Sequence, residues 1–201
     1  MKTILALGDS YTIGTNVSAG ERWPAQLAAA LREQGISTAE PLIIARNGWT
    51  TDELETGIQA ARPQSSYDLV TLLIGVNNQY RGYSLDMYRQ EFAALLVQAI
   101  HFAGGRPDRV VVLSIPDWGV TPFAVVRDRD QITKEIDAFN AANRAEVEKT
   151  GANYVDITPI TRRMTEDSPH LLAADGLHPS GEMYALWVEQ VLPVVMPLLE
   201  E

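Results

Sequence analysis

The sequence of 201 residues has no cysteine, few histidines and fewer basic than acidic side chains. Without cysteine it has no disulfide, no thiolate nucleophile and no metal centre with cysteine ligands. Lysine and arginine number 16 against 26 aspartates and glutamates, so the formal net charge is −10. This balance argues against nucleic acid or an anionic membrane as the main partner, because both require a positive surface.

Long hydrophobic runs are also missing. No stretch reaches the roughly 18 apolar residues of a membrane span, so we expect no integral membrane segment. The apolar tail at 191–199 is too short and contains two prolines, and we expect a final helix packed on the core. The apolar run at 3–7 is too short for a signal peptide. Together with the lack of cysteine this favours a cytoplasmic protein, with export as the alternative if a signal peptide has been removed.

What is present fits a soluble globular protein, with 46% hydrophobic and 21% charged residues. The length and the absence of linkers or repeats predict a single domain over residues 1–201. Short runs rich in Val, Ile and Leu alternate with amphipathic stretches, at 3–7, 42–45, 69–75, 110–115 and 154–157. Their lack of polar alternation is typical of strands covered on both faces. The alternation predicts an α/β fold, a three-layer α/β/α sandwich around a five-stranded parallel sheet.

Helix boundaries are suggested by capping residues and glycines. Trp23 with the following proline opens one helix, Thr51 or Asp52 would cap a second, and Ser84 a third. Apolar positions between 132 and 147 mark a fourth helix. Glycines 35, 104, 105 and 151 stand where helices are expected to end. In such a fold the chemistry lies in the loops after the strands, at their carboxyl ends.

Of the three histidines, one has a neighbour suited to catalysis. His101 falls late in a predicted helix and His170 in a loop, where we expect surface or structural roles. His178 follows Asp175 by three residues, with Gly176 allowing a tight turn, so the carboxylate can reach the ring Nδ1 and orient it. Alternatively, Asp175 only caps backbone amides at a helix entry. The spacing alone leaves these two interpretations equally open.

A histidine–aspartate pair in a hydrolytic site needs a nucleophile, and Ser10 is the best placed serine. It directly follows a predicted buried strand, where a sharp turn would push its hydroxyl into the crevice, and Gly8 would relieve crowding in that turn. The alternative for Ser10 is a helix N-cap. Ser114 lies inside a predicted strand, where a hydroxyl bonded to backbone is expected.

Acyl transfer also needs hydrogen-bond donors for a developing oxyanion. The candidates are the backbone N–H of Ser10, the backbone N–H of Gly48 and the side-chain amide of Asn77. The alternatives are an Asn77 that bonds its own backbone in a turn and a Gly48 that only supplies a positive φ. Neither signal is specific when taken alone.

Taken together, the motifs resemble the four blocks of the GDSL-type, or SGNH, hydrolases: Gly8-Asp9-Ser10-Tyr11, Gly48, Gly75-Val76-Asn77-Asn78 and Asp175-Gly176-Leu177-His178-Pro179. They occur in the family's order and span residues 8 to 179. The resemblance implies a flavodoxin-like fold, Ser10 as nucleophile, Asp175 and His178 as its partners, and no metal or cofactor. It also implies an oxyanion hole formed by Ser10, Gly48 and Asn77.

The same resemblance implies a small-molecule ester as substrate. Tyr11 stands where the family usually has leucine, and Asn78 where aspartate commonly follows the asparagine; both departures concern substrate rather than reaction. A tentative substrate pocket comprises Trp49, Asn78, Trp118 and Phe123, with Tyr80 nearby. The alternative is that these aromatic residues pack structurally. The lack of a lid-length insertion suggests an open crevice for short or medium acyl groups.

Three alternatives to a simple esterase remain. A thioesterase, lysophospholipase or carbohydrate O-deacetylase would use the same site. A non-catalytic flavodoxin-like binding domain would use the same loops for an anionic ligand, although the sequence has no phosphate-binding glycine motif. A metal site built from His170, Asp175 and His178 lacks the helical spacing that such sites use, so we expect no metal.

Overall fold

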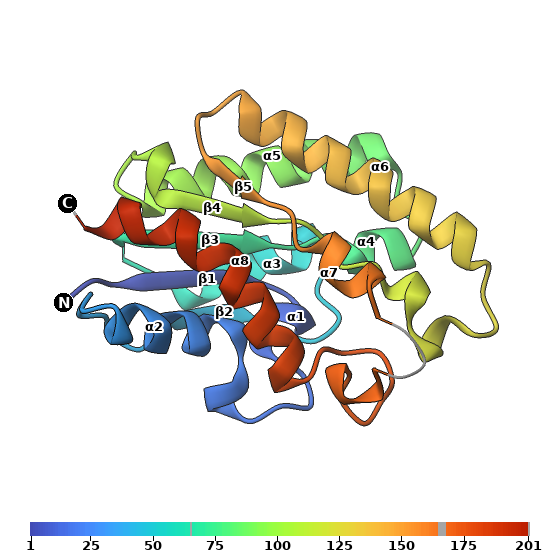
Figure 1. Ribbon diagram of the computed structural model, residues 1–201. Coiled ribbons are helices and arrows are strands. Elements are labelled where there is room, and N and C mark those ends of the chain that lie inside the picture. Colours follow the sequence, from blue (N-terminus) through green and yellow to red (C-terminus); the bar gives the residue numbers. More distant parts are fainter. Residues whose placement is uncertain (65, 165–167, 201) are drawn as a thin grey trace.

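Five parallel strands form one sheet in the computed structural model, which describes residues 1–64, 66–164 and 168–200 (Figure 1). The strands are β1 (Ile4–Gly8), β2 (Leu42–Ala45), β3 (Leu69–Leu73), β4 (Val110–Leu113) and β5 (Asn153–Val155). The predicted α/β fold with a five-stranded parallel sheet is therefore confirmed. The last three strands end two residues earlier than predicted, because the chain has already turned into the loops that carry polar side chains.

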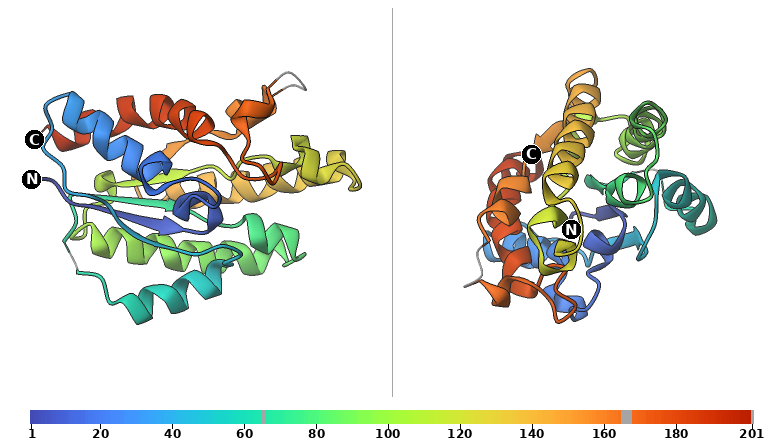
Figure 2. Two further views of the ribbon diagram at one scale, coloured as in Figure 1. Left: turned by 90° about the horizontal axis from the view of Figure 1, so that it is seen from below. Right: turned by 90° about the vertical axis from the view of Figure 1, so that its right-hand side faces the viewer.

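Helices cover both faces of this sheet. On one face α2 (Trp23–Glu33) packs against α8 (Gly181–Leu199), and on the other lie α3 (Thr51–Ala61) and α5 (Leu85–Phe102), with α6 (Arg129–Glu148) against α5 (Figure 2). Three short helices follow strands, namely α1 (Ser10–Ile13), α4 (Val76–Tyr80) and α7 (Thr158–Arg162). Single 3₁₀ turns are found at Ala19–Glu21, Pro107–Arg109, Trp118–Val120, Pro122–Ala124 and Pro169–Leu171. The three-layer sandwich is thus complete.

The strand order is β2-β1-β3-β4-β5. The connection after β1 runs to one side of the sheet and the connection after β2 crosses to the other, so the order reverses at β1 and β3. At such a switch point the loops leaving the two strands diverge, which opens a crevice at their carboxyl ends. The loops after β1 and β3 carry the Ser10 and Asn77 blocks, so the topology itself brings these blocks together.

The expectation that all strands are covered on both faces is wrong for the edges of the sheet. Every residue of β1 and β3 is buried, but in β2 only Ile44 is, and Leu42 is 44% exposed. In β5 only Val155 is buried. The cause is the strand order, which puts β2 and β5 at the two edges, where helices cover them incompletely.

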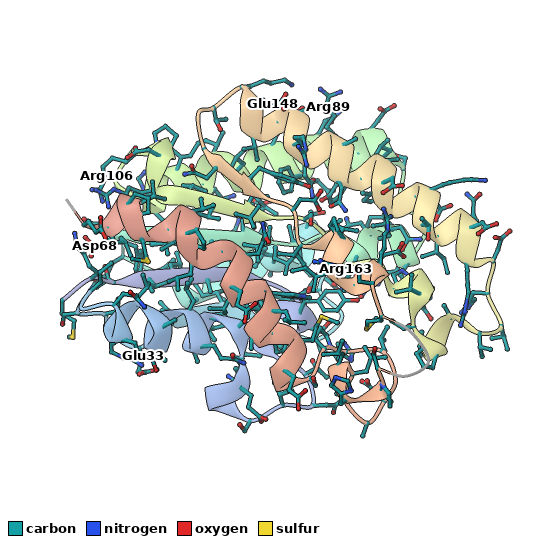
Figure 3. The ribbon with its side chains drawn as sticks, viewed as in Figure 1. Glu33, Asp68, Arg89, Arg106, Glu148 and Arg163 are labelled. Atoms are coloured by element: carbon teal, nitrogen blue, oxygen red, sulfur yellow. The ribbon has the colours of Figure 1, made fainter. Side chains whose placement is uncertain are left out.

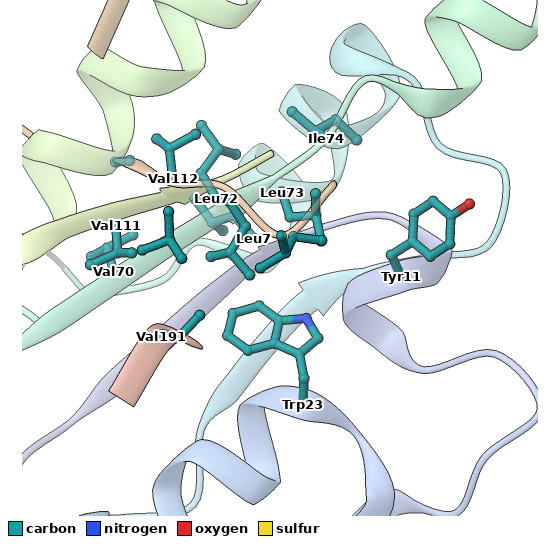
Figure 4. Packing of buried hydrophobic residues seen from close by; sticks show 14 of the residues in the cluster. Leu7, Tyr11, Trp23, Val70, Leu72, Leu73, Ile74, Val111, Val112 and Val191 are labelled. Carbon is teal, nitrogen blue, oxygen red and sulfur yellow. The ribbon is translucent and has the colours of Figure 1, made fainter. Parts of the chain in front are cut away.

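The core between the sheet and the α2/α8 layer is built around large side chains. Trp23 of α2 lies under β1, near Leu7 and Val191 (Figure 4). Among the described residues α8 is the one helix whose length and composition would allow it to cross a membrane. Its Trp187 and Val191 are, however, fully buried in the core. The predicted final helix on the core is confirmed, but it begins ten residues earlier than the apolar tail and includes both prolines.

Two helix starts illustrate how local chemistry sets the boundaries. Thr50 is the N-cap of α3, not Thr51 or Asp52, because the Glu53 carboxylate accepts the Thr50 N–H at 3.0 Å and closes a capping box. Ser84 caps α5 as predicted, its hydroxyl accepting the Met87 N–H. The charged side chains labelled in Figure 3 lie at the surface, some on helices and others in the segments between elements: Glu33, Asp68, Arg89, Arg106, Glu148 and Arg163.

Candidate active site

Ser10 lies at the carboxyl end of β1, where the chain turns directly into α1. Asp9 is the N-cap of that helix and its Oδ1 accepts the Tyr11 N–H at 3.0 Å, so the capping role considered for Ser10 is wrong. Ser10 is the first helical residue and is 4% exposed. A Cβ at Gly8 would lie 2.5 Å from the Leu73 carbonyl oxygen. Glycine is therefore required for β1 to end against β3 and to hold Ser10 at this corner.

His178 and Asp175 form a closely bonded pair in the loop before α8. The His178 Nδ1 lies 2.6 Å from Asp175 Oδ2, and Asp175 Oδ1 accepts the N–H groups of Leu177 and His178 at 3.0 Å each. Gly176 has a φ of +67°, which provides the tight turn. The carboxylate thus orients the imidazole and caps backbone amides at once, so the two interpretations of the spacing describe the same arrangement.

The electrostatics of this pair favour an ionised carboxylate. Burial opposes ionisation of Asp175, but the His178 side chain and the backbone N–H groups of His178 and Leu177 outweigh it and lower the carboxyl pKa below its usual range. The His178 ring is mostly buried and packs at 5.9 Å, centroid to centroid, against the Tyr11 ring. A buried imidazole held at Nδ1 by an anion leaves its Nε2 free to accept a proton.

Ser10 and His178 line one cavity of about 170 Å³ at the switch point of the sheet. Its wall also includes Tyr11, Asn47, Val76, Asn77, Tyr80, Trp118, Phe123 and Leu177. Within the described residues the Ser10 hydroxyl makes no hydrogen bond, to His178 or to any other group. Such contacts are often long in sites without substrate and tighten when it binds. The cavity therefore brings a free hydroxyl and an oriented imidazole to one space.

Asn77 contributes an amide to the same cavity. Its Nδ2 donates one hydrogen to the Trp49 carbonyl oxygen at 2.9 Å, which fixes the amide plane and leaves the other N–H for the cavity. Gly48 has a φ of +84°, and its carbonyl oxygen accepts a bond from Arg81 at 2.6 Å. Arg81 therefore fixes the peptide between Gly48 and Trp49. Gly48 itself is not among the described residues that line the cavity, whereas its neighbour Asn47 is.

Two of the four residues assigned to the substrate pocket line the cavity. These are Trp118 and Phe123, and Tyr80 lines it as well. Trp49 and Asn78 lie outside the described wall, so the assignment of these two residues is corrected. The Trp49 ring packs on α3, where a Cβ at Gly57 would overlap the indole.

Asn78 is fully buried and serves the framework beside the site. Its Oδ1 accepts the Thr51 N–H at 3.1 Å, and its Nδ2 donates to the Thr51 hydroxyl at 2.7 Å. These bonds join α4 to the first turn of α3. The residue next to Asn77 thus holds α4 in place rather than facing substrate.

Trp118 is held by a defined set of contacts. Its Nε1–H donates to Gln79 Oε1 at 2.8 Å, and Gln79 in turn donates to Glu135 at 2.6 Å. The Tyr80 and Phe123 rings pack edge-on against the indole at 5.5 and 6.0 Å. A tryptophan fixed on three sides forms a rigid wall of the cavity.

Sequence reasoning did not place Asn47, Val76, Leu177 or the Tyr11 ring in the cavity wall. Asn47 could have been suspected, since it follows β2 at the same edge of the sheet. Val76 and Leu177 carry no chemical signal that would single them out among apolar residues.

The other histidines lie away from the cavity. His101 is exposed at the end of α5, and His170 is exposed 3.8 Å from Glu182. Among residues 1–64, 66–164 and 168–200 no group of three histidines or carboxylates is arranged to hold a metal ion. Ser114 bonds the backbone N–H groups of Ile157 and Thr158, as expected of a buried serine.

Asp9 is a buried carboxyl directly beside the Ser10 backbone. It is fully buried, and within the described residues its Oδ2 has no hydrogen-bond partner. Burial raises its pKa from 3.8 to about 7, against a smaller opposite effect of the bonds from the Tyr11 N–H and its own N–H. A group that changes charge near neutrality therefore lies under the N-terminus of α1.

Comparisons with known proteins agree with this geometry. The model of the GDSL-like Lipase/Acylhydrolase family matches residues 6–186. A search of curated protein sequences found no match.

Several solved structures share the fold. TesA is 20% identical with a TM-score of 0.75, over 98% of this chain and 100% of its own. The lipase/acylhydrolase from Enterococcus faecalis is 19% identical with a TM-score of 0.75, over 100% and 98%. Axe2, an acetylxylan esterase from Geobacillus stearothermophilus, is 18% identical with a TM-score of 0.72, over 96% and 94%. At these identities the likeness concerns the fold.

Proposed function

The chain belongs to the GDSL-like Lipase/Acylhydrolase family, and from that premise we propose that it is a serine hydrolase cleaving carboxylic esters of short acyl groups. In this proposal residues 1–201 form one hydrolase domain, Ser10 is the nucleophile, and His178 with Asp175 is its base. The observation that carries it is the shared cavity, which the Ser10 hydroxyl and the His178 ring both line while Asp175 holds Nδ1 at 2.6 Å.

The proposed reaction has two steps. His178 Nε2 takes the Ser10 proton as Oγ attacks the ester carbonyl, and Asp175 stabilises the imidazolium that forms. The oxyanion would accept bonds from the N–H groups of Ser10 and Gly48 and from the Asn77 amide. His178 then returns the proton to the leaving alcohol, and the acyl group remains on Ser10. Water then attacks the acyl carbonyl while giving a proton to His178 Nε2. His178 passes that proton to the Ser10 oxygen as the acyl–oxygen bond breaks and the carboxylic acid leaves.

The size of the cavity supports a short acyl group. About 170 Å³ lies below the usual range of about 300–1,000 Å³ for small-molecule pockets. Trp118 limits the space, with Tyr80 and Phe123 packed around it. This favours acetyl and other short esters over lysophospholipids. Carbohydrate O-deacetylation is the second candidate, because an acetyl group fits the same space and Axe2, which shares the fold, is an acetylxylan esterase.

A substrate panel tests the proposal. Purified protein is assayed on p-nitrophenyl esters of increasing chain length, an acyl-CoA, a lysophospholipid and acetylated sugars. We expect kcat/KM to be highest for the short esters and to fall by at least about a thousandfold in Ser10→Ala. Ser10→Ala that keeps near-full activity would contradict the nucleophile, and a maximum at long chains would contradict the short acyl group.

Covalent labelling separates the enzyme from a binding domain of the same fold. A fluorophosphonate probe should label Ser10 in the wild-type protein and leave Ser10→Ala unlabelled. His178→Ala should reduce labelling strongly, because the hydroxyl then lacks its base. A protein that stays unlabelled and hydrolyses no ester of the panel would be a binding domain instead.

A further inference from the structure

We infer that Asn16 is a positioning residue, which acts on the proposed reaction by holding the Asp175 carboxylate in the orientation that His178 requires. The inference rests on the proposed function of Ser10, Asp175 and His178. The Asn16 Nδ2 donates to Asp175 Oδ2 at 2.6 Å, and this is the same oxygen that lies 2.6 Å from His178 Nδ1. The two residues are 159 positions apart, so the contact depends on the fold.

This bond completes the set of donors around the carboxylate. Oδ1 accepts the backbone N–H groups of Leu177 and His178, and Oδ2 accepts from His178 and Asn16. An ionised carboxylate has about four acceptor positions, so all are in use. A carboxylate bonded in this way has one preferred rotation about its Cβ–Cγ bond.

The exposure of Asp175 explains why such a bond matters here. Its side chain is 32% exposed, whereas the His178 side chain is only 10% exposed. Water can therefore compete for Oδ2 and turn the carboxylate away from the imidazole. The Asn16 amide takes the second acceptor position of that oxygen, beside His178, and opposes this rotation. We thus assign Asn16 a role in orientation, and no contact with substrate.

The backbone supports the assignment. Asn16 has a φ of +67°, one of two non-glycine residues with positive φ among the described residues; the other is Arg62 at +47°. Asparagine tolerates this conformation better than most residues, and strained backbone is common at functional sites. Asn16 follows α1, whose first residue is Ser10, through Gly14 at the helix end. The bond to Asp175 therefore connects the helix of the nucleophile to the loop of the base.

Several titratable groups surround Asp175 and could contribute to a pH profile. His178 is bonded to it, and Tyr11 and Tyr184 face it from α1 and α8, both with a pKa raised mainly by burial. Asp9 and Arg22 lie near Tyr184. The tyrosines stay neutral in the assay range. Burial raises the pKa of Asp9 to about 7. Asp9 has no hydrogen bond to Asn16 among the described residues, so differences between variants report on Asn16.

Two substitutions separate orientation from folding. Asn16→Gly removes the amide but suits the positive φ, so the turn can form without strain. Asn16→Asp keeps the size of the side chain and tolerates the same φ, but replaces the donor by a second carboxylate beside Asp175. Arg62→Gly is the matched control, because it relaxes the other positive φ, at the end of α3, and Arg62 is not among the described residues that line the cavity.

The expected results differ in kind. Asn16→Gly should lower kcat about three- to tenfold, the factor typical of the net contribution of one hydrogen bond, with KM nearly unchanged. In Asn16→Asp the added charge should move the acid limb of kcat/KM to higher pH by about one unit, because a nearby anion favours the protonated imidazole. The His178 ring resonances should show the same shift in an NMR titration, which does not depend on activity. Arg62→Gly should match the wild type in all three measurements.

The inference is overturned if Asn16→Gly keeps the wild-type kcat. It is equally overturned if both Asn16 variants lose activity together while the pH profile and the His178 titration stay in place, because that would be a purely structural effect. A failure of the proposed function would look different. In that case Ser10→Ala would hydrolyse esters as fast as the wild-type protein. With that control passed, the Asn16 variants test the orientation of Asp175 alone.

Discussion

Replacing the buried Asp9 by asparagine should remove most of the pH dependence of stability near neutrality. Asp9 is fully buried, its Oδ1 caps α1, and its pKa in the folded protein is about 7 instead of 3.8. Folding therefore favours the protonated form. The stability that this form contributes is complete below about pH 3.8, falls as the pH rises, and is lost above about pH 7.

The magnitude follows from the two values. Each pH unit between them costs about 1.4 kcal/mol of stability, so the change from 3.8 to about 7 amounts to about 4 kcal/mol. Asparagine at position 9 keeps the acceptor for the Tyr11 N–H and does not titrate. Its amide N–H groups would be buried without a partner at the place of Oδ2, which adds a constant cost. The wild type loses this stability as the pH rises and Asp9→Asn does not. The free energy of unfolding of Asp9→Asn minus that of the wild type should therefore rise by up to about 4 kcal/mol from pH 4 to pH 8.

Urea denaturation at pH 4, 5, 6, 7 and 8 measures this difference. Asp68→Asn is the control with the opposite sign. Burial opposes ionisation of Asp68, but the Thr3 backbone N–H and hydroxyl, with Lys2 and Arg106 nearby, lower its pKa. Its contribution is present at neutral pH and is lost on acidification. If the free energies of unfolding of the wild type and of Asp9→Asn change in parallel with pH over this range, the Asp9 carboxyl is not held neutral and the argument fails.

Four further substitutions probe the site and its framework. Trp118→Ala should move the best ester of the p-nitrophenyl series to a longer acyl chain, and an unchanged optimum would remove the indole from the acyl wall. Arg162→Met leaves the fully buried Asp117 without its ion pair at 2.9 Å and should lower the free energy of unfolding by about 3 kcal/mol in urea. Asn77→Ala should lower kcat by about 10²–10³ and leave the melting temperature nearly unchanged. Asn78→Ala should leave kcat nearly unchanged and lower the free energy of unfolding by about 2 kcal/mol, because its bonds to Thr51 are lost. Equal effects of Asn77→Ala and Asn78→Ala on kcat would contradict the separate roles given to the two residues.

Much of the site was predictable because its chemistry is coded in short segments. Each block follows a strand in the sequence, and parallel strands bring their carboxyl ends to one edge of the sheet. Ser10 and Asn77 are therefore neighbours once β1 and β3 are adjacent. Asp175 and His178 contact each other across only three residues, so their pairing needed no knowledge of the fold.

The errors arise where the direction of a side chain depends on tertiary packing. Trp49 and Asn78 stand next to Gly48 and Asn77 in the sequence, but the chain turns sharply at both places, and neighbouring side chains point to different surroundings. Trp49 fills the space over Gly57, and Asn78 is drawn inward by its bonds to α3. Nothing in either block distinguishes a side chain that faces the cavity from one that faces the framework.

The same limit explains why Asn16 escapes notice in the sequence. Its importance comes from a carboxylate 159 residues away, and from the fact that this carboxylate is one third exposed. In a site where burial alone held the acid in place, an extra donor at its edge would change little. Here the carboxylate is partly exposed, so its orientation depends on hydrogen bonds that compete with water. The bond between Asn16 and Asp175 joins the segment that follows β1 and α1 to the loop of His178, so the position of the carboxylate depends on both.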